Sequence, residues 1–312
     1  MSGEKKNPTM SIIENLNQIS RNAGLRIYKR EFLLGYTRML QWIAAYGKKW
    51  IRKMKPSKNK IRLSIVIPVL NEEANLKVLL PILKALINVP HEILIVYDID
   101  NDDSIPVVKT MQRNYPGLRL IHNKLGRGVI NAIKSGTDNA IGHYALIIAA
   151  DDFGAIFAIN DMVSLMDNGC DLVNGTRYAH GGKNITGSLI SKFLSITANK
   201  LFHALSGLAL TDPTLGVKMF RRSKFNEINL ESKPVGWAVS FEFAIKAQLA
   251  GWKLGEVPLI SLNRLYGGKS SFKPGPWVAE YTKWFLWGLT RLPHLKMKKK
   301  VSLRIPFNIK QK

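Results

Sequence analysis

Two groups of acidic residues, each directly after a run of apolar residues, are the side chains in this sequence best suited to chemistry. The six residues are Asp98, Asp100, Asp102, Asp103, Asp151 and Asp152. Carboxylates that lie close together repel one another unless a cation or a hydrogen-bonding ligand shares their site. A Mg²⁺ or Mn²⁺ ion that bridges a substrate diphosphate would relieve this repulsion. Such residues also form turns and caps, but their occurrence after two separate apolar runs favours a ligand site.

The apolar runs are typical of buried parallel strands, because they are short and rich in β-branched residues. We expect strands over 61–70, 92–97, 118–122, 144–150, 171–175 and 253–262. Helical patterns alternate with them: Glu72–Leu86 capped by Asn71, a segment from about Ser104, then 126–136, 189–205 and 240–250. This alternation predicts an α/β fold with a mostly parallel sheet and helices on both faces. Ligands bind such sheets at the carboxyl ends of the strands, where both acidic groups fall.

The formal net charge of +24 suggests a polyanionic partner, such as nucleic acid, an anionic membrane or a phosphorylated substrate. Residues 1–60 hold 14 Lys and Arg against 3 Asp and Glu, and residues 283–312 hold 9 against none. The residues between them are nearly balanced, with 23 against 19. A nucleic-acid-binding core would carry its basic face within the fold itself. We therefore expect an anionic membrane surface, and not nucleic acid, as the partner of the two basic arms.

These patterns divide the chain into three segments. They are a basic amphipathic N-terminal arm and linker over 1–60, a central domain over 61–275, and an aromatic and basic C-terminal arm over 276–312. In the N-terminal arm, apolar residues recur at helical spacing among Lys and Arg, as in helices that lie in a membrane interface. The alternative is a helix that packs on the domain and exposes a charged face.

Several other sites are not expected. Cys170 is the only cysteine, so the chain has no intramolecular disulfide, and the histidines lack the spacing of a zinc site. The first ten residues are polar and do not resemble a signal peptide. No segment has the roughly 20 largely apolar residues that a membrane-spanning helix needs. We expect a cytoplasmic protein, peripheral on the cytoplasmic face of a membrane.

A series of nine short motifs extends from Arg62 to about Phe272. They are SIVIPVLNEEANL (64–76), IVYDIDNDDS (95–104), GRGVINAIKSG (126–136), IIAADD (147–152), LVNGTRY (172–178), SKFLSITANKLF (191–202), DPTLGVKMFRR (212–222), SFEFAIKAQLAGWKLGEVP (240–258) and NRLYGGKSSF (263–272). In this order they resemble the family 2 glycosyltransferases of the GT-A fold, a Rossmann-like α/β fold, and within them the dolichol-phosphate mannosyltransferase group. The resemblance covers roughly two thirds of the chain.

The resemblance implies an inverting transfer of a sugar from a nucleotide-sugar donor, and it implies roles for individual residues. The residues that match the donor site are Pro68, Leu70, Glu72, Asp98, Asp100, Arg127, Gly128, Asn131 and Arg177. Arg177, Asp212 and Glu242 would border the sugar and the acceptor. Arg264 and Lys269 match the basic residues of a loop that closes over phosphate groups.

The metal-binding motif departs from the family pattern. Asp151 matches the last acid of the family's Asp-x-Asp motif, and with Asp152 it would hold Mg²⁺ or Mn²⁺ on the diphosphate. Ala149 replaces the first acid of that motif, and Phe153 stands where a glutamine often helps to hold the metal. Tyr97 likewise replaces the first of two paired acids after the second strand.

The nature of the acceptor decides whether a general base is needed. A polyprenyl phosphate, with a second pKa near about 6, is largely dianionic at neutral pH and attacks without a base. A glycan hydroxyl requires a carboxylate base, and Asp212 and Glu242 are then the candidates. We expect a lipid-linked phosphate acceptor at a membrane surface. The alternatives are a glycan hydroxyl acceptor, or a non-catalytic membrane- or nucleic-acid-binding protein that has kept the fold.

Overall fold

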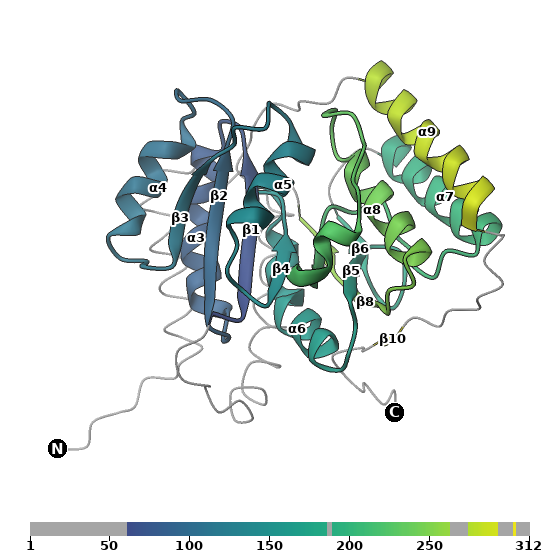
Figure 1. Ribbon diagram of the computed structural model, residues 1–312, viewed down its shortest axis with the longest axis horizontal. Coiled ribbons are helices and arrows are strands. Elements are labelled where there is room, and N and C mark those ends of the chain that lie inside the picture. Colours follow the sequence, from purple (N-terminus) through teal and green to yellow (C-terminus); the bar gives the residue numbers. More distant parts are fainter. Residues whose placement is uncertain (1–60, 186–188, 263–273, 293–301, 304–312) are drawn as a thin grey trace.

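The computed structural model describes residues 61–185, 189–262, 274–292 and 302–303. A sheet with the strand order β10-β8-β5-β7-β4-β1-β2-β3 runs through the middle of this part of the chain (Figure 1). Its strands are β1 (Leu63–Val69), β2 (His91–Tyr97), β3 (Leu118–His122), β4 (Tyr144–Ile147), β5 (Leu172–Thr176), β7 (Lys218–Arg221), β8 (Leu254–Pro258) and β10 (Ser302–Leu303). A separate small sheet pairs β6 (Lys183–Asn184) with β9 (Ile260–Ser261).

The described strands of the main sheet are parallel except for β7, which confirms the predicted α/β architecture. β7 is antiparallel to both of its neighbours, β4 and β5. It was not predicted, because its sequence, KMFR, is too short and too charged to form an apolar run. Since β7 runs the other way, its first residue, Lys218, lies at the carboxyl edge beside Ile147 and Asn174.

Hydrophobic cores on the two faces of the sheet hold the helices in place. Leu63, Ile65 and Ile67 of β1 face a core that contains residues of α3, α4 and α6, whereas Val66 faces α5. This separation follows from the two-residue period of a strand. The helices are α3 (Glu73–Leu86), α4 (Ser104–Gln112), α5 (Val129–Asn139), α6 (Ile159–Asp167), α7 (Leu189–Ser206), α8 (Ala238–Leu249) and α9 (Pro274–Arg291), with 3-10 helices η1 (Phe153–Ala158) and η2 (Arg222–Glu227).

Helices α7 and α9 pack side by side at one end of the described domain, next to α8 (Figure 1). The ring of Phe202 lies 4.7 Å from that of Phe241 in α8 and 5.1 Å from that of Phe285 in α9, measured between centroids. At Gly288 a Cβ atom would come within 2.6 Å of the Phe202 ring, so glycine permits this close approach. The start of the predicted C-terminal arm is therefore a packed helix, in which Trp284 is buried.

Two predicted segments lie wholly or partly outside the described residues. The N-terminal arm, 1–60, lies wholly outside the described residues. The C-terminal arm lies outside them beyond residue 292, apart from the short strand β10. The division at residue 275 stays a prediction. Among the described helices, none combines the length and the apolar character that crossing a membrane requires.

Three local predictions are corrected by the structure. The N-cap of α3 is Glu72, not Asn71, which has a φ of 57° and donates its backbone N–H to the Asp102 carboxylate at 3.2 Å. The predicted strand 144–150 ends at Ile147, because the chain turns where the carbonyl of Ala149 accepts a hydrogen bond from the Asp152 amide. The predicted strand 253–262 is divided into β8 and β9.

Candidate active site

The ends of β1 and β4 bring several predicted donor-binding residues to one edge of the sheet. Pro68 lies near the end of β1, and Leu70 just beyond it is 53% exposed. Burial raises the pKa of the Glu72 carboxyl, against a 2.6 Å hydrogen bond from Asn75, and repulsion by Asp151 raises it further. This repulsion means that Glu72 and Asp151, which are far apart in sequence, share one region of the edge.

Asp98, at the end of β2, joins this edge to the start of α5. Its carboxylate accepts hydrogen bonds from the Gly128 backbone N–H at 2.8 Å and from the Asn123 side-chain amide at 2.7 Å. Gly128 has a φ of 115°, and a Cβ atom there would lie 2.6 Å from Cβ of Pro234. Only glycine suits this position, so the predicted pair Asp98 and Gly128 is brought together. Among the other predicted residues here, Arg127 is exposed and Asn131 is half-buried.

The loop that carries Asp151 and Asp152 is held by a close backbone approach. A Cβ atom on Gly154 would lie 1.6 Å from the carbonyl oxygen of Ile260 in β9, so no other residue fits there. Asp152 is almost fully buried, and its Oδ1 has no hydrogen-bond partner among the described residues. Burial, and next the charge of Asp151, raise the pKa of Asp152 to about 7, although Arg177 and the amides of Ala155 and Gly154 act in the opposite direction.

The two adjacent carboxylates fit a divalent metal only if other ligands complete its coordination. Among the residues that the structure describes, no group of three or more His, Cys, Asp and Glu side chains could hold a metal ion. Hard cations such as Mg²⁺ take six oxygen ligands, several of which are commonly water or substrate phosphate. The buried Oδ1 of Asp152 offers an unused acceptor for such an ion. Asp151 and Asp152 therefore fit a metal that a donor diphosphate would share.

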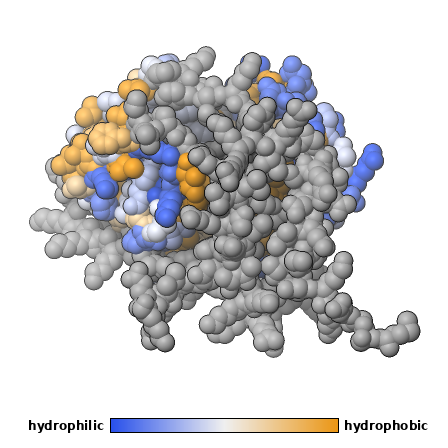
Figure 2. Space-filling model, turned by 180° about the vertical axis from the view of Figure 1, so that it is seen from behind, coloured by the Kyte–Doolittle hydropathy of each residue, from blue (hydrophilic) through white to orange (hydrophobic). Residues whose placement is uncertain are grey.

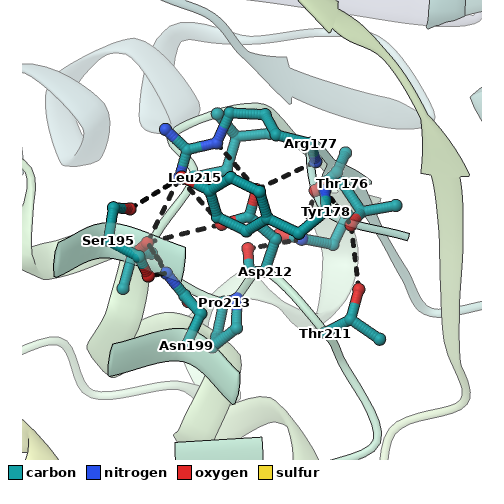
Figure 3. A network of polar contacts seen from close by, with 12 residues as sticks. Thr176, Arg177, Tyr178, Ser195, Asn199, Thr211, Asp212, Pro213 and Leu215 are labelled. Carbon is teal, nitrogen blue, oxygen red and sulfur yellow. Dashed lines mark hydrogen bonds and ion pairs between the residues drawn. The ribbon is translucent and has the colours of Figure 1, made fainter. Parts of the chain in front are cut away.

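An ion pair between Arg177 and Asp212 lies at the same edge, beyond the end of β5 (Figure 3). Nε and Nη2 of Arg177 each donate to a different oxygen of Asp212 at 2.8 Å, and the Arg177 backbone N–H donates to the same carboxylate at 3.0 Å. Asp212 has no exposed surface. Burial opposes the charge of Arg177, but the Asp212 carboxylate outweighs it and holds the pKa of the guanidinium above its usual range. The two hydrogen bonds between the guanidinium and the carboxylate fix the orientation of both side chains.

Helix α7 contributes polar side chains to this network. The hydroxyl of Tyr178, whose ring lies 4.8 Å from the Arg177 guanidinium, donates to the Ser195 hydroxyl at 2.7 Å. The Asn199 amide donates to the Thr214 hydroxyl at 3.0 Å, in the loop that carries Asp212. As Figure 3 shows, one side of α7 thus faces the ion pair.

Sequence reasoning missed a row of buried polar residues beneath this network. Asn174, Lys218 and Glu256 belong to β5, β7 and β8, and none of them is more than 1% exposed. For Asn174 and Glu256 the available signal was a polar residue inside a predicted strand, because a polar group buried in a sheet needs partners. Lys218 gave no such signal, since β7 was not predicted.

Some predicted residues do not join the site. The side chain of Asp100 is 88% exposed, and its Oδ1 lies 4.0 Å from Nδ1 of His122. Asp102 and Asp103 accept hydrogen bonds from backbone amides, including those of Asn71 and Glu73, and so hold the loop before α3. This is the role of turn and cap residues. Arg264 and Lys269 lie outside the described residues.

Glu242, a candidate base, is occupied inside the protein. It is fully buried and accepts hydrogen bonds from the Glu231 backbone N–H at 2.6 Å, and from the backbone N–H and hydroxyl of Ser232 at 2.8 and 2.6 Å. Lys246, one turn along α8, forms an ion pair with it at 2.8 Å. Glu242 therefore holds the backbone at residues 231 and 232 from inside the protein. The helical spacing of Glu242 and Lys246 in the sequence predicts an ion pair on the helix surface, and the structure shows the pair but buries the carboxylate.

The chain is similar to proteins of one known family. Residues 64–228 match the family model described as Glycosyl transferase family 2. A dolichol-phosphate mannosyltransferase from Pyrococcus furiosus is 27% identical over 232 residues, which cover 72% of this chain and 64% of that relative, less than two thirds of its length. A dolichyl-phosphate beta-glucosyltransferase from Trichomonas vaginalis is 29% identical over 223 residues, which cover 67% of this chain and 68% of that protein.

A solved structure shares the fold. Glucosyl-3-phosphoglycerate synthase from Mycobacterium tuberculosis, in complex with Mn²⁺, UDP and glucosyl-3-phosphoglycerate, superposes with a TM-score of 0.51 at 18% identity. The match covers 75% of this chain and 80% of the synthase. The likeness confirms the GT-A-like architecture.

Glu242→Gln tests the assignment of this carboxylate to the backbone at residues 231 and 232. We expect the free energy of unfolding in urea to fall by about 2 kcal/mol, because the NH₂ group of glutamine cannot accept the hydrogen bonds that a carboxylate oxygen now accepts from Glu231 or Ser232, and buried donors are left without an acceptor. The matched control is Glu73→Gln, which removes an exposed pair with Lys77 at the same helical spacing and should change stability by less than about 0.5 kcal/mol. Unchanged stability together with lost activity would return Glu242 to the list of candidate bases.

Proposed function

Since the chain belongs to glycosyl transferase family 2 and is a glycosyltransferase, we propose that it transfers a sugar, with inversion, from a nucleotide-sugar donor to a polyprenyl phosphate or related lipid-linked acceptor at a membrane surface. The observation that carries the acceptor assignment is the two-sided character of α7. One side of this helix reaches the Arg177–Asp212 ion pair through Ser195 and Asn199.

The other side of α7 is apolar and exposed, and α9 extends this surface. We name it the α7/α9 face, and its members have large apolar side chains that are 48–68% exposed: Phe193, Leu194, Leu201 and Leu205 of α7, with Val278 and Leu286 of α9. Figure 2 shows apolar residues gathered at the upper left, the side on which these helices lie. Contiguous exposed apolar surface of this kind marks binding sites for proteins or membranes. A lipid-linked acceptor lying in a membrane beside this face would have its phosphate close to the site.

The basic arms supply a second attraction to the same partner. Residues 1–60 and 283–312 carry most of the net positive charge, and each basic residue near an anionic leaflet contributes about 1 kcal/mol. Apolar contact by the α7/α9 face and charge on the arms together favour a bilayer over a soluble polyanion. The cytoplasmic side of the membrane stays a prediction.

The carboxylates at the acceptor side favour an acceptor that needs no base. Both oxygens of Asp212 accept hydrogen bonds from Arg177, and Glu242 is enclosed in the interior. A phosphate dianion attacks the anomeric carbon directly, forming the new C–O bond while the bond to the nucleoside diphosphate breaks and its electron pair leaves with the diphosphate. No proton has to move in this step. A hydroxyl acceptor would need a free carboxylate, and the described contacts offer none at this position.

The proposed roles of the chain's own residues follow from their places at the edge. Glu72, Asp98 and Gly128 would border the nucleoside, and Asp151 with Asp152 would hold Mg²⁺ or Mn²⁺ on the diphosphate. Such an ion stabilises the negative charge that develops on the leaving group. Arg177, kept charged by Asp212, would orient the sugar and the acceptor phosphate. Arg264 and Lys269 are proposed to close over the phosphates.

The names of the relatives support the proposed acceptor, and the contents of the synthase structures support the proposed donor and metal. The two curated relatives are named for transfer of mannose and glucose to dolichol phosphate. Structures of the synthase contain UDP with Mn²⁺ or Mg²⁺, which supports a nucleotide-sugar donor and a divalent metal in this chain.

Transfer is tested by incubating the full-length protein with a panel of nucleotide sugars, Mn²⁺, and polyprenyl phosphate in vesicles. We expect labelled glycolipid with one donor, and Asp151→Asn should lower its rate by at least about 100-fold, because charge on the leaving group loses its stabilisation. The control Asp138→Asn, an exposed carboxylate on α5, should leave the rate unchanged. Transfer to a sugar hydroxyl but not to polyprenyl phosphate would refute the acceptor assignment.

Membrane contact is tested by sedimentation with anionic vesicles at low and high salt. We expect Leu201→Ser/Leu205→Ser to weaken the salt-resistant part of binding by at least about tenfold, because two apolar side chains lose burial in the interface. High salt should remove the electrostatic contribution of the arms to vesicle binding and leave the apolar contribution of the α7/α9 face. Ile141→Ser, an exposed apolar residue before β4 at the opposite edge of the sheet, is the control. Binding of the double variant equal to wild type at high salt would contradict this contact.

A further inference from the structure

Three buried polar residues form a row across the sheet, directly below the loop that carries Asp212. Lys218 of β7 and Glu256 of β8 are both register partners of Asn174 in β5, so the three residues lie side by side on adjacent strands. Their exposed fractions are 0%, 1% and 0%, respectively. An ammonium and a carboxylate are costly to bury in a sheet, so we expect these two residues to have a role that requires them.

Two members of the row bind the first half of the loop 211–215. Glu256 accepts hydrogen bonds from the Thr211 backbone N–H at 2.6 Å and from the Thr211 hydroxyl at 3.0 Å. The side-chain amide of Asn174 donates to the backbone carbonyl of Asp212 at 2.9 Å. The main chain at Thr211 and Asp212 is therefore held by hydrogen bonds to side chains of β5 and β8.

Lys218 binds the second half of the loop. Its ammonium donates to the carbonyl oxygens of Pro213 at 3.0 Å and Leu215 at 2.8 Å, and also to Oδ1 of Asn174. Three acceptors require three N–H donors, which only the charged form has. Burial lowers the pKa of Lys218 to about 7, while the carboxylates of Asp212 and Glu256 favour its charge and Arg177 opposes it.

We propose that Lys218, Asn174 and Glu256 are positioning residues, which hold the loop 211–215 so that Asp212 presents Arg177 in one fixed orientation to the reacting groups. None of them touches the surface, so none of them can contact a substrate. They act by supplying hydrogen-bond partners to the main chain on both sides of Asp212, which fixes the backbone of this short irregular loop. Small displacements matter here, because a shift of about 1 Å at a reacting group lowers rates by up to about 100-fold.

The test uses the full-length protein with Lys218→Met, which keeps the stem and removes the ammonium, and Glu256→Gln, which keeps the shape of the side chain. Lys109→Met, at an exposed position of α4, is the matched control. The first readout is the side-chain N–H resonance of Arg177 in protein labelled with ¹⁵N-arginine, assigned by its loss in Arg177→Lys. It reports the Arg177–Asp212 contact without any substrate. The second readout, which rests on the proposed function, is kcat and the donor KM of glycolipid formation.

We expect both row variants to shift or broaden the Arg177 signal and to lower kcat by about 10- to 100-fold, with a smaller change in the donor KM, since Glu72, Asp98 and Gly128, which are proposed to border the nucleoside, follow other strands. The control should match wild type in both readouts. An unchanged Arg177 signal in folded variants would overturn the proposal, and so would a changed signal with unchanged kcat. If Lys218→Met does not fold, Glu256→Gln decides alone. If wild type transfers no sugar, the proposed function fails and the Arg177 signal still decides the positioning role.

Discussion

Arg177 and Asp212 form a two-point ion pair at the carboxyl edge of the sheet, where the Asp212 side chain is fully buried and that of Arg177 is 14% exposed. A buried ion pair of this kind is stable only when its geometry is good and the remaining polar groups find partners. The Arg177 backbone N–H and the Thr214 hydroxyl are the further partners of this pair. The row of Asn174, Lys218 and Glu256 does not touch the two charged groups and instead binds the main chain of the loop that carries Asp212. Lys218 belongs to that row because β7 runs antiparallel to β4 and β5. The first residue of β7 therefore lies beside Ile147 and Asn174, near the ends of those two strands.

The same ion pair connects the two halves of the proposed reaction. On one side, Asp152 is close enough for Arg177 to act on its pKa, which links the pair to the carboxylates proposed for the metal and the donor diphosphate. On the other side, Tyr178 and Thr214 link it to Ser195 and Asn199 of α7. Since the outer side of α7 belongs to the exposed α7/α9 face, a single helix separates the proposed membrane contact from the groups proposed to act on the sugar. Most of the net charge lies in residues 1–60 and 283–312, whereas the basic and acidic residues between these segments nearly balance.

Much of the fold was predictable from sequence, because β-branched runs and the residues after them follow the period and the edge chemistry of a parallel sheet. The family resemblance placed Asp98 with Gly128 in the donor site and Arg177 with Asp212 beside the sugar and acceptor. In the structure the members of each pair are hydrogen-bonded to each other. The failures have physical causes. Asp102 and Glu242 are typical catalytic residue types, but their carboxylates bind backbone amides, and sequence does not distinguish an acid that binds its own chain from one that binds a ligand. Lys218 was missed because its partners, two backbone carbonyls and an amide on another strand, have no sequence signature.

The central claim is that Arg177 and Asp212 act as one unit, and a double-mutant cycle on glycolipid formation tests it most directly. The rates to compare are kcat/KM for wild type, Arg177→Lys, Asp212→Asn and the double variant, since groups that act as a unit have non-additive effects. We predict that each single change causes a large loss and that the double variant loses no more than the more damaged single variant. Losses that multiply in the double variant would show that the two residues act independently and would contradict the account.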